Sequence, residues 1–243
     1  MDGGPFERVV AIVPCLNEAE AIRSVVAAVR ATGINTVIVV DGNSTDGTAE
    51  CARTAGAQVV VEARRGYGLA MRTRLAALPP DTEIILFIDG DGSDRPEQIP
   101  NLLAPLLSQT ADFSHGTRLK GDREAGALSL PQIVAGHLAG LLIRTVYGVR
   151  YTDMSPFRAI RRTSLDQLGM QDESFGWNLE MQMRAAAAGL RIVELPVGQQ
   201  MRAGGVSKVS GNITVVARVV WVLATTFIRL AATLRRQPQI TLR

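Results

Sequence analysis

Short apolar runs alternate with stretches of helical periodicity through the first half of the chain. The apolar, β-branched runs span residues 8–13, 36–41, 58–63 and 83–89. The helical stretches span residues 18–31, 48–55, 67–78 and 96–109. This alternation predicts an α/β domain with a mainly parallel sheet that helices cover on both faces. In such sheets the ligand site lies beyond the carboxyl ends of the strands.

After residue 120 the pattern is looser. It predicts helices over 131–148 and 178–189 and strands over 155–160 and 191–197. A polar loop that contains glycine comes next, and a long apolar helix then runs from about Ile213 to Leu234. We therefore expect a main domain over residues 1–211 and an appended helix with a basic tail over residues 212–243.

The end of the chain is basic. Seven basic side chains and no acidic one follow Glu194, so this part carries +7, while residues 1–194 carry −4 of the net charge of +3. The asymmetry predicts an anionic partner. Arg218 and Arg229 are eleven residues apart in the last helix, within about 20° of the same face. The ten residues between them are fewer than the roughly 20 of a membrane span. We expect an amphipathic helix at a membrane surface, its arginines reaching lipid phosphates; packing on the domain or on a second subunit is the alternative.

Composition narrows the class of protein. Of the 243 residues, 47% are hydrophobic and 5% are aromatic, which argues against disorder and against several membrane spans. Cys15 and Cys51 stand apart without metal-type spacing, so we expect a reducing cytosol and no disulfide framework. The first residues do not form a basic-then-apolar leader, and no nucleic-acid reading motif occurs. We therefore expect neither export nor a nucleic-acid partner.

Two aspartates that follow the apolar run 84–88 carry the candidate chemistry. Asp89 and Asp91 leave the strand end on the same side, because alternating residues of a strand face opposite ways. Burying them without a counter-charge would be very unfavourable, and carboxylates suit Mg²⁺ or Mn²⁺, which usually also bind phosphate oxygens. A polar turn is the alternative. Asp41 ends another strand at the same edge, where it could accept hydrogen bonds from a base or a ribose.

Segments along nearly the whole chain occur in an order typical of one family. Those of the first half read VPCLNE (13–18), VVDGNSTDGT (39–48), RRGYGLAMRTR (64–74) and FIDGDGSDRPEQI (87–99). Those of the second half read HGTRLKG (115–121), YTDMSPFRAIRR (151–162), GWNLEMQMRAAAAG (176–189), ELPV (194–197) and RAGGVSK (202–208). Together they resemble glycosyltransferase family 2, of the GT-A fold, in the branch of dolichol-phosphate mannose synthases and polyprenyl-phosphate glucose synthases.

The resemblance implies roles for residues on the donor side of the site. Asp89 and Asp91 would be the metal-binding pair that holds the diphosphate of a sugar nucleotide, with Mg²⁺ or Mn²⁺ as the ion. The residues that would line the pocket of the base and the ribose are Pro14, Asn17, Glu18 and Asp41.

The resemblance also implies roles at the reacting end. Arg118 would point at phosphate, and Arg202 and Lys208 would close over the donor diphosphate or grip an acceptor phosphate. Asp153 and Glu180 match acidic positions near the transferred sugar.

The residues themselves leave alternatives open for the last two. Asp153 could cap the turn before Pro156, and Glu180 could pair with Arg184 one helical turn further on.

The implied activity is a metal-dependent, inverting transfer of a hexose from a nucleotide sugar of the UDP-glucose or GDP-mannose type to a polyprenyl phosphate. The protein would be cytoplasmic, at the periphery of the membrane. A phosphate nucleophile is already ionised and needs no strong base. The alternatives are transfer to a small soluble acceptor and a non-catalytic subunit that binds sugar nucleotides. The oligomeric state is left open, a homo-oligomer included.

Overall fold

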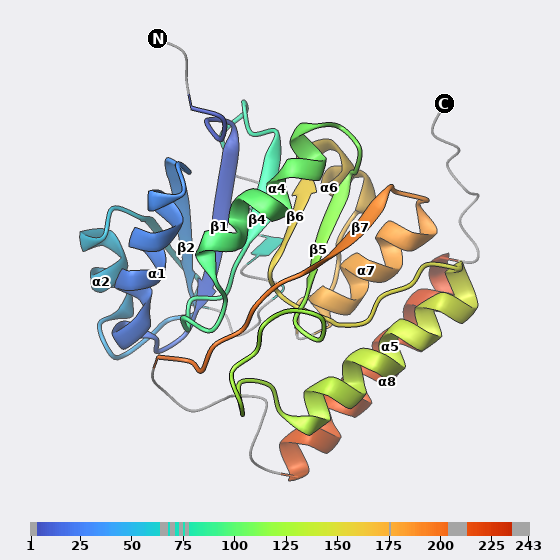
Figure 1. Ribbon diagram of the computed structural model, residues 1–243. Helices are drawn as coiled ribbons and strands as arrows, with labels where there is room; N and C mark the ends of the chain where they lie inside the picture. The colour runs from blue at the N-terminus through green and yellow to red at the C-terminus, as the bar shows by residue number, and fades with distance from the viewer. Residues whose placement is uncertain are drawn as a thin grey trace.

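A seven-stranded sheet with the order β3-β2-β1-β4-β6-β5-β7 lies at the centre of the molecule (Figure 1). The computed structural model describes residues 4–63, 68, 71–72, 75, 78–174, 176–203 and 213–234, with the backbone alone for 213–220 and 222. The strands are β1 Val9–Cys15, β2 Thr36–Asp41, β3 Gln58–Val61, β4 Ile84–Phe87, β5 Phe113–Thr117, β6 Arg158–Arg161 and β7 Ile192–Pro196. The helices are α1 Ala19–Ala31, α2 Thr48–Thr54, α4 Ile99–Leu107, α5 Leu130–Tyr147, α6 Arg162–Leu168, α7 Trp177–Ala187 and α8 Ile213–Leu234, with a 3-10 turn at Pro96–Gln98.

The sheet is parallel except at one strand. β1 pairs in parallel with β2 and β4, β2 with β3, and β5 with β7. β6 runs antiparallel between β4 and β5. The prediction of a mainly parallel α/β sheet is confirmed. Because β6 is reversed, the segment that enters it lies at the same sheet edge as the segments that leave β4 and β5.

Helices cover both faces of the sheet, as the alternation along β1 requires. Val9, Ala11 and Val13 pack in a core with α1, α2 and α4. Val10 and Ile12 pack in a second core with α5, α6, α7 and α8. Successive side chains of a strand point to opposite faces, and a strand buried on both faces needs the continuous apolar run that the sequence shows.

Some boundaries differ from the predictions. The sequence pattern does not predict α6, because most of its residues are polar and only two leucines, the buried Leu165 and Leu168, mark an apolar side. β6 begins at Arg158 rather than at residue 155, because a turn precedes it in which Phe157 N donates to Ser155 Oγ at 3.2 Å. The helix predicted over 67–78 lies largely outside the described residues.

Helix α5 lies directly against the segment that leads into β6. The helix starts in a capping box in which Ser129 N donates to Gln132 Oε1 at 2.9 Å. Its buried side carries small residues, and a Cβ atom on Gly140 would lie only 2.0 Å from the carbonyl oxygen of Tyr151. A side chain at this position would therefore push α5 away from the site segment.

Helix α8 packs on the domain through one face. Leu230 is buried in the core that α8 shares with α5 and α7. Arg229 donates from Nη2 to Asp172 Oδ2 at 3.0 Å while 64% of its side chain is exposed, and its contact with lipid phosphates stays a prediction. The side chain of Arg218 lies outside the described residues. Packing on the domain is thus observed for one face of the helix, while Trp221 and Ile228 are exposed.

None of the helices that the structure describes is long and apolar enough to cross a membrane.

We expect Gly140→Ala to have a free energy of unfolding about 1 to 3 kcal/mol lower than that of Gly136→Ala, because overpacking costs about this much and the obstacle at Gly140 is backbone. Gly136→Ala, one helical turn earlier, is the matched control, since its Cβ would meet nothing nearer than 3.4 Å. Both variants gain the same helix propensity, about 1 kcal/mol. Urea unfolding measures the difference; equal stabilities for the two variants would contradict the close approach.

Candidate functional site

Hydrogen bonds tie together the two loops at the carboxyl ends of β1 and β2. Asn17 N donates to Ser44 Oγ at 2.8 Å, and Asn17 Oδ1 accepts the N–H of Thr45 at 3.0 Å. Asn17 has a φ of 53°, a left-handed conformation that asparagine adopts more readily than most residues. Glu18 N donates to Thr48 Oγ1 at 2.9 Å. Residues 17 and 18 therefore have a fixed place relative to α2.

Asp41 is buried at the end of β2. Its carboxylate accepts the N–H of Ser44 at 3.1 Å and also the Ser44 hydroxyl. Cys15 Sγ lies 3.8 Å from Oδ1. These contacts shape the loop after β2, and contact of Asp41 with a base stays a prediction.

The loop after β4 carries the two aspartates and is held against β1. Gly90 N donates to the carbonyl oxygen of Pro14 at 3.2 Å. A Cβ atom on Gly90 would lie 2.9 Å from the Cβ of Cys15, so a larger residue between Asp89 and Asp91 would force the loop away. Pro14 thus helps to place the aspartate pair through its carbonyl group.

A third aspartate lies beside this pair. Asp94 is 2% exposed, and its Oδ2 accepts the N–H of Asp89 at 3.1 Å. Its Oδ1 is buried and, among the described residues, has no hydrogen-bond partner. Burial and the carboxylates of Asp94 and Asp91 raise the pKa of Asp89 well above its ordinary value. Burial and the charge of Asp91 raise the pKa of Asp94 to about 7. This loop concentrates negative charge that needs a positive partner to stay ionised.

The chemistry of this loop fits a divalent cation. Asp89 and Asp91 supply the oxygen ligands that Mg²⁺ and Mn²⁺ prefer. Within the described part of the chain, no three His, Cys, Asp or Glu side chains converge where they could hold a metal ion. An ion on the aspartate pair would therefore take its other ligands from water or from a bound phosphate, as Mg²⁺ commonly does.

Positive charge reaches the aspartates from residues far along the chain. Arg202 Nη2 donates to Asp91 Oδ2 at 2.8 Å and to Glu18 Oε1 at 3.1 Å. The charge of Arg118 lowers the pKa of Asp89 and so partly offsets its burial. The structure thus brings five of the predicted site residues to one place. Glu18, predicted to line the base pocket, is in contact with Arg202.

Arg118 and Asp153 form a buried pair at the same sheet edge. Arg118 follows β5 and Asp153 precedes the reversed strand β6, so the two meet. Arg118 Nε and its backbone N–H donate to Asp153 Oδ2 at 2.7 and 3.0 Å, and Nη2 donates to Oδ1 at 2.8 Å. Burial alone would raise the pKa of Asp153, but the hydrogen bonds and charge of Arg118 outweigh it and lower the pKa to about 2. Asp153 therefore fixes the direction of the Arg118 side chain.

Glu180 is buried in α7. Its Oε2 accepts the N–H groups of Asp172 at 2.6 Å and of Gln171 at 3.0 Å, and Arg184 Nε donates to Oε1 at 2.7 Å. The alternative of a pair with Arg184 is thus observed, with both side chains buried. Contact of Glu180 with a sugar stays a prediction. Lys208 lies outside the described residues.

The sequence pattern does not reveal a polar network behind Asp153. Glu194 Oε1 accepts the N–H of Thr152 at 2.6 Å, and Glu194 Oε2 accepts the Thr152 hydroxyl at 2.9 Å and lies 3.0 Å from Lys120 Nζ. The network ties β7 to the segment before β6. The one signal in the sequence was Glu194, which follows two apolar residues in a predicted strand. An acidic side chain at such a position needs a polar partner.

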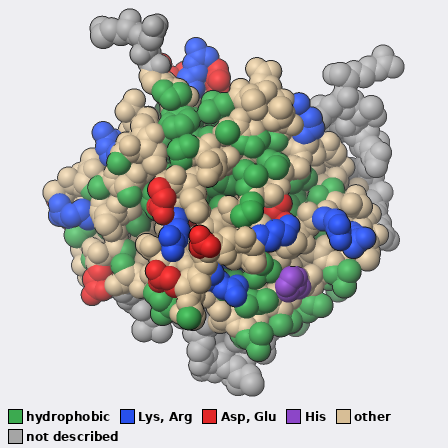
Figure 2. Space-filling view, viewed as in Figure 1, with side chains coloured by type: hydrophobic (Ala, Val, Ile, Leu, Met, Phe, Trp, Pro, Cys, Tyr) green, Lys and Arg blue, Asp and Glu red, His purple; other side chains and the backbone are tan. Residues whose placement is uncertain are grey.

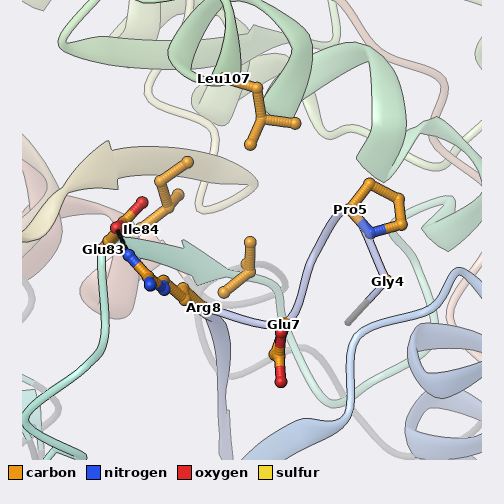
Figure 3. A pocket seen from close by; sticks show the side chains of 8 residues that line it. Gly4, Pro5, Glu7, Arg8, Glu83, Ile84 and Leu107 are labelled. Atoms are coloured by element: carbon orange, nitrogen blue, oxygen red, sulfur yellow. Dashed lines mark hydrogen bonds and ion pairs between the residues drawn. The ribbon is translucent and has the colours of Figure 1, made fainter. Parts of the chain in front are cut away.

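A hollow of about 220 Å³ lies at the opposite edge of the sheet (Figure 3). Its lining consists of Gly4, Pro5, Glu7, Arg8, Val9, Glu83, Ile84 and Leu107. It opens where β1 and β4 begin. Because ligands of parallel α/β sheets bind beyond the carboxyl ends of the strands, we assign the chemistry to the aspartate edge and not to this hollow.

Comparisons with known proteins agree with this geometry. The family model described as glycosyl transferase family 2 matches residues 10–169. An uncharacterized glycosyltransferase of Mycobacterium tuberculosis is 42% identical over 209 residues, which cover 85% of this chain and 92% of the relative. The undecaprenyl-phosphate mannosyltransferase of Micrococcus luteus is 31% identical over 218 residues, which cover 85% of this chain and 89% of the relative.

A solved structure shares the fold. Glucosyl-3-phosphoglycerate synthase from Mycobacterium tuberculosis, crystallised with Mn²⁺, uridine diphosphate and phosphoglyceric acid, superposes with a TM-score of 0.72 at 22% identity. The match covers 92% of this chain and 78% of that chain. The GT-A fold predicted from the sequence is confirmed.

We expect Asp153→Asn to destabilise the protein by about 3 to 5 kcal/mol at pH 7, because it leaves the Arg118 charge buried without its partner. The pKa of Asp153 is depressed to about 2 in the folded protein, so its stabilisation is present above the unfolded pKa of about 3.9 and is lost as the pH falls through about 2. Urea unfolding should show the gap between wild type and variant narrowing below about pH 4.

Asp166→Asn is the control for that experiment, because Asp166 pairs with Arg162 at the surface with 59% of its side chain exposed. Such pairs contribute at most about 1 kcal/mol. A gap for Asp153→Asn that stayed constant down to the lowest pH at which the wild type is folded would contradict the depressed pKa.

Proposed function

Because the chain belongs to glycosyl transferase family 2, we propose that it moves a hexose from a nucleotide diphosphate sugar to a polyprenyl phosphate, with Mg²⁺ or Mn²⁺ at Asp89 and Asp91. The observation that carries the proposal is the group of carboxylates after β4, with Arg118 and Arg202 beside it. A donor diphosphate needs cations, and the carboxylates of this edge would hold one while the arginines supply two more.

Charge develops during the proposed reaction next to the aspartate pair and the two arginines. Breaking the bond between the anomeric carbon and the diphosphate builds negative charge on the leaving group and positive charge on the sugar ring. A bound divalent ion would supply Lewis-acid stabilisation of the leaving diphosphate. The hydrogen bonds to Asp153 hold Arg118 in one orientation. A preorganised charge of this kind stabilises a transition state without a reorganisation cost.

The state of two carboxylates supports a phosphate acceptor. Asp153 is held ionised by Arg118 with a pKa of about 2, and the oxygens of Glu180 accept backbone N–H groups and bind Arg184. Asp153 is not suited to take a proton from a hydroxyl, because a useful base has a pKa near the working pH, and the oxygens of Glu180 are already engaged by these hydrogen bonds. A phosphate nucleophile is already ionised, so a direct displacement with inversion needs no such base.

An exposed apolar face on α5 supports a lipid acceptor. Leu130, Leu138 and Leu141 are 72%, 54% and 57% exposed and recur at helical spacing with Val134 and Leu142. Figure 2 shows hydrophobic side chains along the edge where Figure 1 places α5. The helix contains no acidic residue, which suits an anionic membrane surface. The Micrococcus luteus relative is named for an undecaprenyl-phosphate acceptor. We infer a peripheral position at the cytoplasmic face of a membrane.

The remaining predicted residues complete the proposal. The joined loops after β1 and β2 would receive the base and the ribose, with Pro14, Asn17 and Asp41 as contacts. Glu18 would lie between this pocket and the ion. Lys208 would reach the phosphates from a part of the chain that the structure does not describe.

The test is transfer of labelled hexose from UDP-glucose or GDP-mannose to vesicles that contain undecaprenyl phosphate, with Mn²⁺. We expect label in the organic-soluble lipid fraction, and we expect Asp91→Asn to reduce it by at least about 10³-fold, because the variant removes an ion ligand that acts in the transition state. Asp81→Asn, an exposed aspartate before β4, is the control and should keep wild-type transfer. Label on soluble phosphate acceptors alone would refute the lipid acceptor.

We expect the double variant Leu138→Glu, Leu141→Glu to bind anionic vesicles at least tenfold more weakly, since that factor needs only about 1.4 kcal/mol and burying a single leucine contributes about 1.5 to 3 kcal/mol. Leu107→Glu, an exposed leucine of α4 on the other face of the sheet, should bind as the wild type does. Co-sedimentation measures the bound fraction. Equal binding by all three proteins would remove α5 from the membrane contact.

A further inference from the structure

A cation of the chain itself already lies between two carboxylates of the site. Arg202 Nη2 is 2.8 Å from Asp91 Oδ2 and 3.1 Å from Glu18 Oε1. The exposed fractions of the side chains are 22% for Arg202, 17% for Asp91 and 7% for Glu18. In surroundings of this kind opposite charges attract several times more strongly than in bulk water. The arginine therefore neutralises the carboxylate that the proposed ion would use.

The backbone around Arg202 holds the guanidinium in place. Residues 199–203, which we call the strap, run along the loop after β4. Gln200 N donates to the carbonyl oxygen of Ser93 at 2.9 Å, and Gln200 Nε2 donates to that of Gly92 at 2.8 Å. Ala203 N donates to the carbonyl oxygen of Asp91 at 3.1 Å. Because hydrogen bonds fix the strap on both sides of residue 202, the ion pair belongs to a built contact and not to a loose surface side chain.

We propose that Arg202 is an internal competitor for the divalent ion, and that its guanidinium leaves Asp91 only when the ion and a nucleotide diphosphate bind together. The inference rests on the ion site of the proposed function. An ion that binds alone must break the pair between Arg202 and Asp91 and then stay near a positive charge. A diphosphate removes this cost, because its oxygens give the guanidinium a new anionic partner.

The consequence is a coupling between two ligands of the same site. If the diphosphate helps the ion to displace Arg202, the ion must help the diphosphate to bind by the same factor. An arginine that only gripped phosphate would behave differently, since its removal would leave the affinity for the ion alone unchanged. The affinity for Mn²⁺ without nucleotide therefore separates the two roles of Arg202.

The experiment measures Mn²⁺ binding to the full chain by calorimetry, without nucleotide and with saturating UDP or GDP. In the wild type we expect the nucleotide to tighten Mn²⁺ binding roughly tenfold, within the usual range of coupling between ligands. Arg202→Gln should bind Mn²⁺ alone roughly tenfold more tightly than the wild type and should lose most of the coupling. Arg202→Lys, which keeps the charge, should lie between the two.

Arg123→Gln is the matched control, because Arg123 is exposed and its backbone bridges to the strap at Gln199. It removes the same charge near the same segment and should leave Mn²⁺ binding unchanged. Thermal unfolding checks that every variant is folded.

Two outcomes would overturn the proposal in distinguishable ways. If Arg202→Gln and the wild type both bind Mn²⁺ without nucleotide, and with equal affinity, the competitor role is refuted and the ion site stands. Absence of Mn²⁺ binding to the wild type and to every variant, with and without nucleotide, would refute the ion site and the competitor with it.

Discussion

Carboxylates that share one edge of a sheet must share positive charge, and most of the structure around this site follows from that constraint. Burial and the nearby carboxylates of Asp94 and Asp91 raise the pKa of Asp89, and burial and the charge of Asp91 raise the pKa of Asp94. Two arginines supply the positive charge. Arg118 is oriented by Asp153, and Arg202 is placed by the strap. A divalent ion would complete the balance, and the same arrangement would accept the charge of a diphosphate.

The elements of the sheet could be predicted from the sequence because their signals are local. Each strand of the first half is an apolar run, and a polar cluster at its end marks the sheet edge. The reversed direction of β6 and the existence of α6 carry no comparable signal, since direction depends on which neighbours a strand finds and α6 is short and polar. The tail helix shows the same limit: an apolar stripe fits a protein core and a membrane equally well, and the structure uses one face for the core.

The site could be predicted in its residues more than in its contacts. Asp89, Asp91, Arg118 and Arg202 were identifiable as charged residues at predicted strand ends or in motifs of the family. Their pairing was not, because Arg118 meets Asp153 across 35 residues and Arg202 meets Asp91 across 111. Glu180 shows how a motif residue can turn inward, since its carboxylate satisfies backbone N–H groups of the 171–172 segment. Asp94 was hidden by its position in a turn that aspartate favours for other reasons.

The order of the residues along the chain has a consequence for biosynthesis. Glu18, Asp89, Asp91 and Asp94 leave the ribosome well before Arg118 and Arg202. At that stage β4 also lacks β6, its later neighbour, and so presents a bare strand edge. The nascent first half therefore carries an acidic cluster without its arginine partners beside an unprotected strand, and such a strand is open to aggregation and to chaperones. Completion of the last strand and the strap, and not emergence of the first four strands, should mark the moment when this domain becomes stable.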